Sequence, residues 1–426
     1  MNESRTAATP GLPPLPRLLW VLLAAAGTFA LTMGARQSMG LFVNTLNTHT
    51  GIGLAAVSLA FAFGQLWWGL TQPVAGLIAD RIGAGRVLVV GLVLVAFGTA
   101  LTPFMTSTAG LIFAIGVLAA GGAGMAGPAV LMAATTRLVP AERRGLASGI
   151  VNAGGSFGQF IFAPVAQGIT AAAGWVSALY SLAAFTLLAL PAAWVLRTRP
   201  HENAPPAMPA AAAPAAPREG VRAVLARALA LPSYRWLCAG FFVCGFHVAF
   251  IATHLPGVVA SCQLPPEVGA WSLAVIGLFN ILGSLTIGWA IGYQGGRWRM
   301  KSLLSLIYAA RALAVMAFVF APKTSTTMLI FAAVIGFTYL STVPPTAGLV
   351  ARFFGPAHMA MLFGVVMLSH QIGGFLGAYL GGKSFEWTGN YDWMWWADIV
   401  LAVGAALAHL PIDEKKKATL AAAQPA

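Results

Sequence analysis

The stretch Gly76-Leu-Ile-Ala-Asp80-Arg81-Ile-Gly83-Ala-Gly-Arg86 is a short polar bridge between two long apolar segments. Apolar runs precede it (53–79) and follow it (87–104), so the sequence predicts that it is the loop of a membrane hairpin. The glycines at 76 and 83 favour a close approach of the two helices and the loop backbone. We expect Asp80 to lie against a helix N-terminus and to pair with Arg81 or Arg86, where helix and side-chain charges agree.

The composition extends this membrane assignment to the whole chain. Of the 426 residues, 58% are hydrophobic and only 8% are charged, whereas soluble domains carry about 25% charged residues. A bilayer crossing takes about 20 apolar residues. Twelve such runs are present, at about 18–43, 53–79, 87–104, 109–135, 146–171, 175–196, 236–261, 268–293, 302–321, 326–350, 358–382 and 392–411. We therefore expect an all-α integral membrane protein with twelve transmembrane helices.

The net charge of +13 is distributed as the positive-inside rule requires. With the N-terminus in the cytoplasm, 20 of the 24 Lys and Arg residues fall on the cytoplasmic side. Lys323 and Lys383 fall outside, and Arg36 and Arg311 lie within apolar runs. This pattern predicts a multi-pass protein of the cell inner (plasma) membrane with both termini cytoplasmic, and it argues against a nucleic-acid partner.

The chain is a duplication with an offset of about 215 residues. Gly149 and Gly158 recur as Gly364 and Gly373, and Ser58-Leu-Ala recurs as Ser272-Leu-Ala. A Pro- and Ala-rich stretch at 198–217 separates the copies, and the segment after it predicts an amphipathic helix on the inner leaflet. The predicted units are a cytoplasmic tail (1–17), a six-helix bundle (18–197), a cytoplasmic linker (198–235), a second six-helix bundle (236–411) and a cytoplasmic tail (412–426).

The G-x-x-x-D-R-x-G-x-x-R pattern of the opening stretch resembles the loop between the second and third helices of major facilitator superfamily transporters. That resemblance implies two six-helix pseudo-repeats, a substrate site near the bilayer midplane and transport by alternating access. It also implies that residues 76–86 act as a conformational gate. The second copy, from Gly288 to Arg299, keeps glycines and arginines but lacks the aspartate.

Ionisable residues inside a membrane are costly and mark functional sites. Arg36, Arg311, His247, His254 and His370 lie within apolar runs, and the one intramembrane carboxylate is Asp398. A cavity lined by cations without matching carboxylates favours an anion.

The superfamily fold places helices 1, 4, 7 and 10 around the cavity, which ranks these residues. Arg36 is the leading substrate contact, its alternative being a bridge to a helix-end carbonyl, and His370 follows. Arg311 is on an outer support helix, where a structural contact to helix 8 or 10 is favoured over a substrate role unless its long stem reaches inward. Asp398, also on a support helix, is interpreted as a structural partner or an interfacial residue. For His247, a substrate contact and a structural contact are equally favoured. Tyr339 and Asn280 are further candidates, as neutral groups that could form hydrogen bonds with the substrate.

Two stretches, Arg36-Gln-Ser-Met-Gly-Leu-Phe and Trp67-Trp68-Gly-Leu-Thr-Gln-Pro73, resemble the bacterial monocarboxylate and oxalate–formate branch of this superfamily. Leu278-Phe279-Asn280-Ile-Leu-Gly283 adds to the resemblance. In that branch an arginine that binds the carboxylate commonly follows the asparagine by four residues, and here that position is Ser284.

These observations predict a secondary transporter of a small organic anion, with a carboxylate as the favoured class. An exporter of amphipathic or aromatic compounds is the alternative, because the chain is rich in Trp and Phe. We expect a monomer, with a co-transported proton left open. No spacing of cysteines or acidic residues suggests an enzyme, a metal or a cofactor. The phosphate-loop pattern at 377–384 ends an apolar helix rather than following a strand, so it predicts no nucleotide site.

Overall fold

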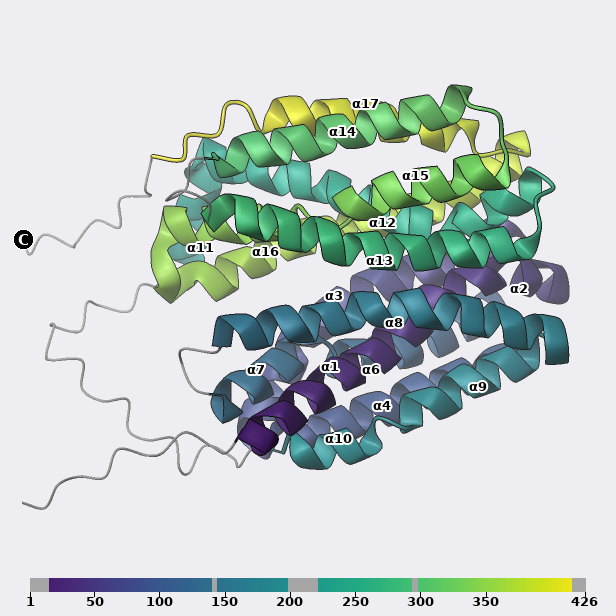
Figure 1. Ribbon diagram of the computed structural model, residues 1–426, viewed down its shortest axis with the longest axis horizontal. Coiled ribbons are helices and arrows are strands. Elements are labelled where there is room, and N and C mark those ends of the chain that lie inside the picture. Colours follow the sequence, from purple (N-terminus) through teal and green to yellow (C-terminus); the bar gives the residue numbers. More distant parts are fainter. Residues whose placement is uncertain (1–14, 140–143, 198–220, 293–297, 416–426) are drawn as a thin grey trace, which may run out of the picture.

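The computed structural model describes residues 15–139, 144–197, 221–292 and 298–415. Within these ranges the regular elements are helices, and they form two bundles that lie side by side with their axes roughly parallel (Figure 1). Most of the predicted N-terminal tail, of the linker and of the C-terminal tail lies outside the described residues.

The N-terminal bundle contains thirteen helical segments of the described chain. They are α1 (Leu15–Ser38), η1 (Met39–Phe42), α2 (Val43–Thr50), α3 (Leu54–Ile82), α4 (Ala84–Leu101), η2 (Thr102–Phe104), α5 (Thr108–Leu111), η3 (Ile112–Ala120), α6 (Gly121–Met125), α7 (Pro128–Leu138), α8 (Arg144–Ala173), α9 (Trp175–Leu187) and α10 (Leu190–Val195).

The short helix α11 precedes the C-terminal bundle, which consists of α12 to α17. The segments are α11 (Val221–Ala230), α12 (Pro232–Ser261), α13 (Pro266–Gly292), α14 (Met300–Phe320), α15 (Ser325–Thr338), α16 (Val343–Thr388) and α17 (Asp392–Ala408). The helix α16 contains a kink at Gly355, where φ is +72°.

These segments make up the twelve predicted crossings. Ten stretches of the described chain are long and apolar enough to cross a membrane. The helices α8, 30 residues long, and α17, 17 residues long, complete the twelve. Several crossings are built from more than one segment: α1, η1 and α2 form the first, α5 to α7 the fourth, and α15 with the start of α16 the tenth.

The stretch from residue 76 to 86 is not the loop that the sequence predicts. The helix α3 continues to Ile82, α4 begins at Ala84, and Gly83 alone connects them with φ of +92°. Asp80 and Arg81 therefore lie in the last turn of α3. Nothing breaks the helix before Gly83, which can adopt this positive φ because it has no Cβ. A Cβ on Gly76 would meet nothing within 4 Å, so Gly76 provides no close helix contact.

The internal repeat reappears as equivalent packing in the two bundles. A Cβ on Gly158 of α8 would collide with the Ala30 carbonyl of α1, and one on Gly373 of α16 would collide with the Phe242 carbonyl of α12. The other repeat-related pair, Gly149 and Gly364, has nothing within 4 Å in either bundle. Each bundle thus packs its first helix against its fifth through the same glycine.

We call the end of the molecule at which α1 begins and α17 ends the terminal end, and the other end the distal end (Figure 1). At the distal end the two bundles are joined by α3 with α16 and by η1 with α12. The backbone N–H of Ala55 at the start of α3 donates to Glu386 Oε1 of α16 at 2.9 Å. A Cβ on Gly40 would collide with the carbonyl of Ala252. The distal end is therefore closed in this conformation.

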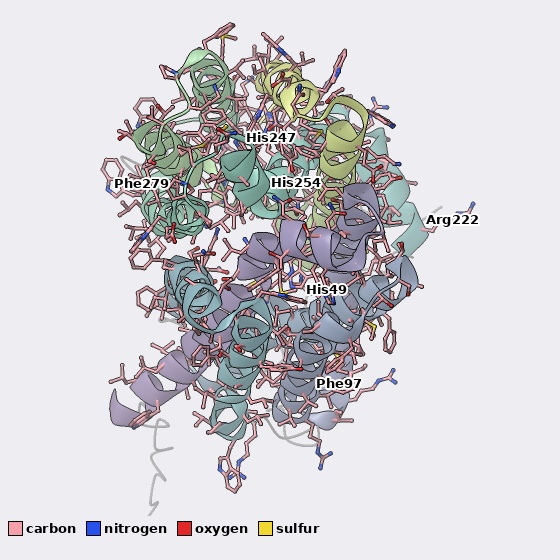
Figure 2. The ribbon with its side chains drawn as sticks, turned by 90° about the vertical axis from the view of Figure 1, so that its right-hand side faces the viewer. His49, Phe97, Arg222, His247, His254 and Phe279 are labelled. Carbon is pink, nitrogen blue, oxygen red and sulfur yellow. The ribbon has the colours of Figure 1, made fainter. Side chains whose placement is uncertain are left out.

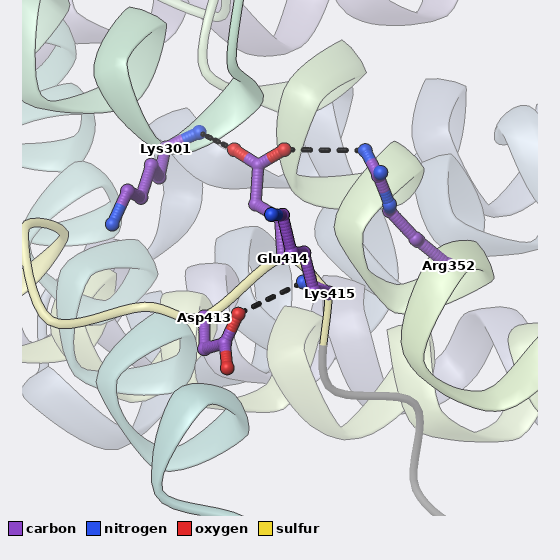
Figure 3. Close-up of polar contacts among 5 residues, drawn as sticks. All are labelled: Lys301, Arg352, Asp413, Glu414 and Lys415. Carbon is purple, nitrogen blue, oxygen red and sulfur yellow. Dashed lines mark hydrogen bonds and ion pairs between the residues drawn. The ribbon is translucent and has the colours of Figure 1, made fainter.

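At the terminal end, the segment after α17 is fastened to the C-terminal bundle. Glu414 accepts from the backbone N–H of Lys301 at 2.8 Å and from Arg352 Nη1 at 3.2 Å (Figure 3). The carboxylate lies at the first turn of α14, where unpaired N–H groups and the helix dipole favour an anion. The Glu414 side chain thus links the start of α14 to Arg352 of α16.

Candidate substrate site

A cavity of about 50 Å³ lies where the N-terminal bundle meets α12. Its walls come from the first crossing, α3, α4, η3 and α12; they are formed by Arg36, Gln37, Met39, Gly40, Phe61, Gly64, Gln65, Val95, Thr99, Ile115, Ala119, Ala120, Ala252 and Thr253. A cavity that holds a single water has a volume of roughly 10–15 Å³. In this conformation the cavity therefore accommodates only a small solute.

Arg36 is the charged group of this cavity. Its Nη2 donates to Gln65 Oε1 of α3, and its Nη1 lies 3.5 Å from Gln37 Oε1. The guanidinium carbon lies 4.7 Å from the centre of the Trp68 ring. Among the described residues no carboxylate pairs with Arg36, so its partners leave the full positive charge in place. The partners of Arg36 are thus side chains, and not a helix-end carbonyl as in the alternative interpretation of the sequence.

Trp68 adds an unused donor beside the guanidinium. Its indole Nε1 is buried and has no hydrogen-bond partner in the described structure. At the following residue, a Cβ on Gly69 would collide with the side chain of Gln371 of α16, whose amide is also buried and unpartnered. Buried polar groups normally find partners, so these groups are unusual, although neither side chain lines the cavity in this conformation.

The tenth crossing breaks next to this site. The helix α15 ends at Thr338 and α16 begins at Val343. Tyr339 lies in the break: its hydroxyl donates to the Val248 carbonyl at 2.9 Å, and Arg36 is near enough to interact with it electrostatically. Asn280 of α13 accepts from the Leu340 backbone N–H at 3.0 Å and donates to Ser156 Oγ of α8 at 2.9 Å. Asn280 therefore links the break to the N-terminal bundle.

Arg311, His247 and Asp398 form one buried cluster inside the C-terminal bundle, outside the cavity lining. Arg311 donates to the carbonyls of Thr338 and Tyr339, the second at 3.1 Å, and its Nη1 lies 3.3 Å from His247 Nδ1. His247 Nε2 lies 3.4 Å from Asp398 Oδ1. Figure 2 shows His247 within the helices of this bundle, in contrast to Arg222, which points outward.

The two remaining histidines make contacts between helices. His370 packs its ring on Phe241, with 5.0 Å between centroids, and its Nδ1 is unpartnered. His254 Nε2 lies 2.7 Å from the carbonyl of Ala378 and joins α12 to α16. Neither ring lines the cavity.

The structure thus divides four of the six residues predicted from sequence into two groups, and Asn280 and His370 belong to neither. Arg36 lines the cavity and Tyr339 lies beside it, whereas Arg311 and His247 belong to the buried cluster with Asp398. Sequence reasoning missed Gln65 and Trp68, which are one helical turn apart on α3. A glutamine in the middle of an apolar run, on the same face as a tryptophan, is the signal that identifies them.

A family model described as the Major Facilitator Superfamily matches residues 24–377 and 290–425 of this chain. An MFS-type transporter of Bacillus subtilis, YcxA, is 23% identical over 95% of this chain and 97% of its own length. Monocarboxylate transporter 13 of Rattus norvegicus is 26% identical over 87% of this chain and 83% of its own. The oxalate:formate antiporter of Oxalobacter formigenes is 30% identical over 40% of this chain and 39% of its own.

Solved structures share the fold. The nucleoside transporter NupG covers 93% of this chain and 99% of its own with a TM-score of 0.73 and 16% identity. A D-xylose-proton symporter covers 93% and 98% with a TM-score of 0.70 and 14% identity. At these identities the likeness concerns the architecture alone.

Proposed function

This chain belongs to the Major Facilitator Superfamily and transports a solute across a membrane by alternating access, and from that premise we propose that its solute is a small organic anion. A carboxylate is the favoured class. The proposal places the carboxylate on Arg36, in the cavity between the N-terminal bundle and α12. We further propose that the protein acts as a monomer in the cell inner membrane with both termini in the cytoplasm.

One observation carries the proposal: Arg36 faces the cavity with its charge uncompensated. Insertion scales put the cost of an arginine at a helix centre at about 2.5–3.5 kcal/mol. The partners of Arg36 are the amides of Gln65 and Gln37 and the ring of Trp68, which orient the guanidinium without neutralising it. A planar guanidinium with free donors matches a carboxylate in two parallel hydrogen bonds.

Two further points support this class of solute. The Trp68 indole N–H is a buried donor without an acceptor next to Arg36, and an anion brings acceptors. Relatives of the chain include proteins named monocarboxylate transporter 13 and oxalate:formate antiporter. In the monocarboxylate and oxalate–formate branch, the arginine that binds the carboxylate is on helix 8, at the position of Ser284 here. In this proposal Arg36 of helix 1, which lines the cavity, takes over that role.

The alternative, an exporter of amphipathic or aromatic compounds, has less support. Phe61 is the aromatic residue of the cavity wall, and many other large aromatic side chains, such as Trp289 and Phe320, are exposed on the outside of the bundle. Such positions suit lipid and the membrane interface. A cavity of about 50 Å³ also suits a few atoms better than an amphipathic drug.

Thermal unfolding of the purified protein distinguishes the two classes. We expect formate, lactate or oxalate to raise the unfolding temperature in a saturable way, because a ligand that binds the folded state stabilises it. Tetraphenylphosphonium, an amphipathic cation, should have no effect. Saturable stabilisation by the cation and none by any carboxylate would reverse the assignment.

A further inference from the structure

The cluster of Arg311, His247 and Asp398 brings two opposite charges and a titratable ring into the dry interior of the C-terminal bundle. All three residues are at most 1% exposed. They come from α14, α12 and α17, so three crossings meet at this point. A buried charged group is expensive unless it is well paired and hydrogen-bonded.

The carboxylate of Asp398 is neither closely paired nor hydrogen-bonded. Neither of its oxygens accepts a hydrogen bond from the described residues, and the nearest donor, His247 Nε2, is 3.4 Å from Oδ1. That ring nitrogen lies closer, at 3.1 Å, to the backbone carbonyl of Asp398. The carboxylate therefore has free lone pairs in a site that disfavours its charge.

The hydrogen-bond pattern also shows which group accepts an added proton. Arg311 can only donate, so the Nδ1 of His247 that faces it is an acceptor, and the proton of the neutral ring is on Nε2. A second ring proton would point at the guanidinium. Protonation of Asp398 instead removes a poorly solvated charge and leaves the contacts of Arg311 in place.

Few other titratable groups face the cluster. The neighbouring elements contribute Tyr308 of α14, Cys244 of α12, Tyr339 in the break and His370 of α16 next to Cys244. On the described part of α13, Glu267 lies exposed in the first turn and does not face the cluster. Tyr308 is engaged as a donor to the Gly240 carbonyl at 2.6 Å. Asp398 is thus the one carboxylate that the described elements bring to this interior.

We propose that Asp398, held against His247 and Arg311, is the site at which this carrier binds a proton together with its anion, an inference that rests on the function proposed above. The step adds one proton from water to a carboxylate oxygen and breaks no other bond. The cluster is closed to solvent in this conformation, so the proton exchanges when the break between α15 and α16 loosens.

The break connects the two sites physically. Arg311 holds the carbonyls of Thr338 and Tyr339, and Tyr339 reaches the neighbourhood of Arg36. Protonation of Asp398 leaves Arg311 without a counter-charge, and an anion at Arg36 restores negative charge to the same region. Each event therefore favours the other, because coupling between binding sites is reciprocal. The expected result is symport of one proton with one anion.

Infrared difference spectroscopy on the purified protein tests the proton site without any solute. On acidification the wild type should gain, besides the C=O stretching bands of its exposed carboxyls, a separate C=O band from a buried carboxyl, and Asp398→Asn should lose that band alone. Asp392→Asn, at the exposed start of the same helix, is the matched control and should keep it. A wild-type band that survives in Asp398→Asn would overturn the proposal. Asp398→Glu, which keeps a carboxyl if the asparagine variant fails to fold, should shift the midpoint and the position of the band; an unshifted band would overturn it equally.

Lactate uptake into proteoliposomes then tests the coupling. With the interior more alkaline, the wild type and Asp392→Asn should accumulate lactate, and Asp398→Asn should lose accumulation while retaining lactate exchange. The apparent affinity of the wild type should weaken by up to about tenfold per pH unit as the pH rises, and Asp398→Asn should lose this dependence. Proton-driven accumulation by Asp398→Asn would overturn the proposal. Absence of lactate binding by the wild type, with the infrared band present, would instead contradict the carboxylate assignment and leave the proton site standing.

Discussion

At the scale of residues, the two arginines of the first and ninth crossings have opposite environments. Arg36 lines a cavity and is oriented by neutral partners, whereas Arg311 is 1% exposed and bound to the carbonyls of a helix break. An unpaired carbonyl in a membrane interior costs free energy because no water replaces the lost donor. Arg311 therefore stabilises the fold, and Arg36 is available for a solute.

The stability of two glutamine variants should reflect this difference. We expect Arg311→Gln to lower the unfolding temperature by several degrees, since buried groups that lose a partner cost about 1–3 kcal/mol. Arg36→Gln should unfold within about one degree of the wild type. Thermal unfolding in one detergent measures both. Equal destabilisation of the two variants would mean that Arg36 is a structural residue.

The sequence identifies the cavity residue but not the cluster. Arg36 is predicted because a cation in the first apolar run has no acidic neighbour in that run. The association of Arg311 with His247 and Asp398 joins residues 64 and 151 positions apart, and no local pattern records such a contact. Gln65 is missed for a related reason: a single amide in an apolar helix gains meaning only when its partner is known.

At the scale of elements, glycines determine how closely the crossings pack. Gly158 and Gly373 are equivalent in the repeat, and each lies against a backbone carbonyl of the first helix of its own bundle. Small residues at such contacts allow helices to approach in a membrane, where apolar burial provides no driving force. The repeat in the sequence therefore predicts the contact, although not every glycine belongs to one.

Alanine at two positions of α16 tests this packing. Gly373→Ala should destabilise the protein by about 1–3 kcal/mol, because the added methyl overlaps the Phe242 carbonyl. Gly364→Ala, with nothing within 4 Å, should be neutral or slightly stabilising. The unfolding temperatures of the two variants provide the comparison. Indistinguishable values would show that the α12–α16 contact is looser than described.

Glu386 closes the distal end by capping a helix of the other bundle. The first residue before α3, Gly53, provides no side-chain cap, and the Glu386 carboxylate accepts from Ala55 N–H in its place. Lys383 Nζ lies 3.2 Å from the same carboxylate. Because α3 and α16 belong to different bundles, this contact exists only when the distal end is closed.

Glu386→Gln should therefore open the distal end more often. Replacing a charge-assisted bond by a neutral one weakens it by about 1 kcal/mol, which is about fivefold in the population of the open state. A cysteine at the buried position Ser58, in a variant without the native cysteines, should react with a thiol reagent correspondingly faster. Glu267→Gln, an exposed glutamate at the same end, is the control. An unchanged rate in Glu386→Gln would exclude the contact as a closing element.

At the scale of the whole molecule, composition and hydropathy suffice to predict the fold. Twelve apolar runs and the duplicated glycines require two six-helix bundles, and the structure differs from the predicted ends by a few residues in most cases. Composition and hydropathy do not predict that the distal end is closed, because closure depends on contacts between the bundles that form and break during transport. The connection at Gly83 differs from the predicted loop because the polar residues Asp80 and Arg81 extend α3 instead of ending it.

The orientation of the molecule follows from the charge distribution and remains a prediction. Cysteines introduced at residues 210 and 420, which lie outside the described residues, should resist membrane-impermeant reagents in intact cells. A cysteine at Thr324, exposed in the connection between α14 and α15 at the distal end, should react. Labelling of positions 210 or 420 from outside would contradict cytoplasmic termini.

The central claim is that Arg36 binds the anion that this carrier transports. Its most direct test is counterflow of radiolabelled lactate, formate or oxalate, whichever stabilises the protein most, in proteoliposomes containing wild type, Arg36→Lys or Arg36→Gln. Arg222→Gln, on the exposed face of α11, is the matched control. The account predicts wild-type exchange for the control, at least about tenfold weaker affinity for Arg36→Lys, which offers a point charge instead of a fork, and no exchange for Arg36→Gln. Wild-type exchange by a well-folded Arg36→Gln protein would contradict it.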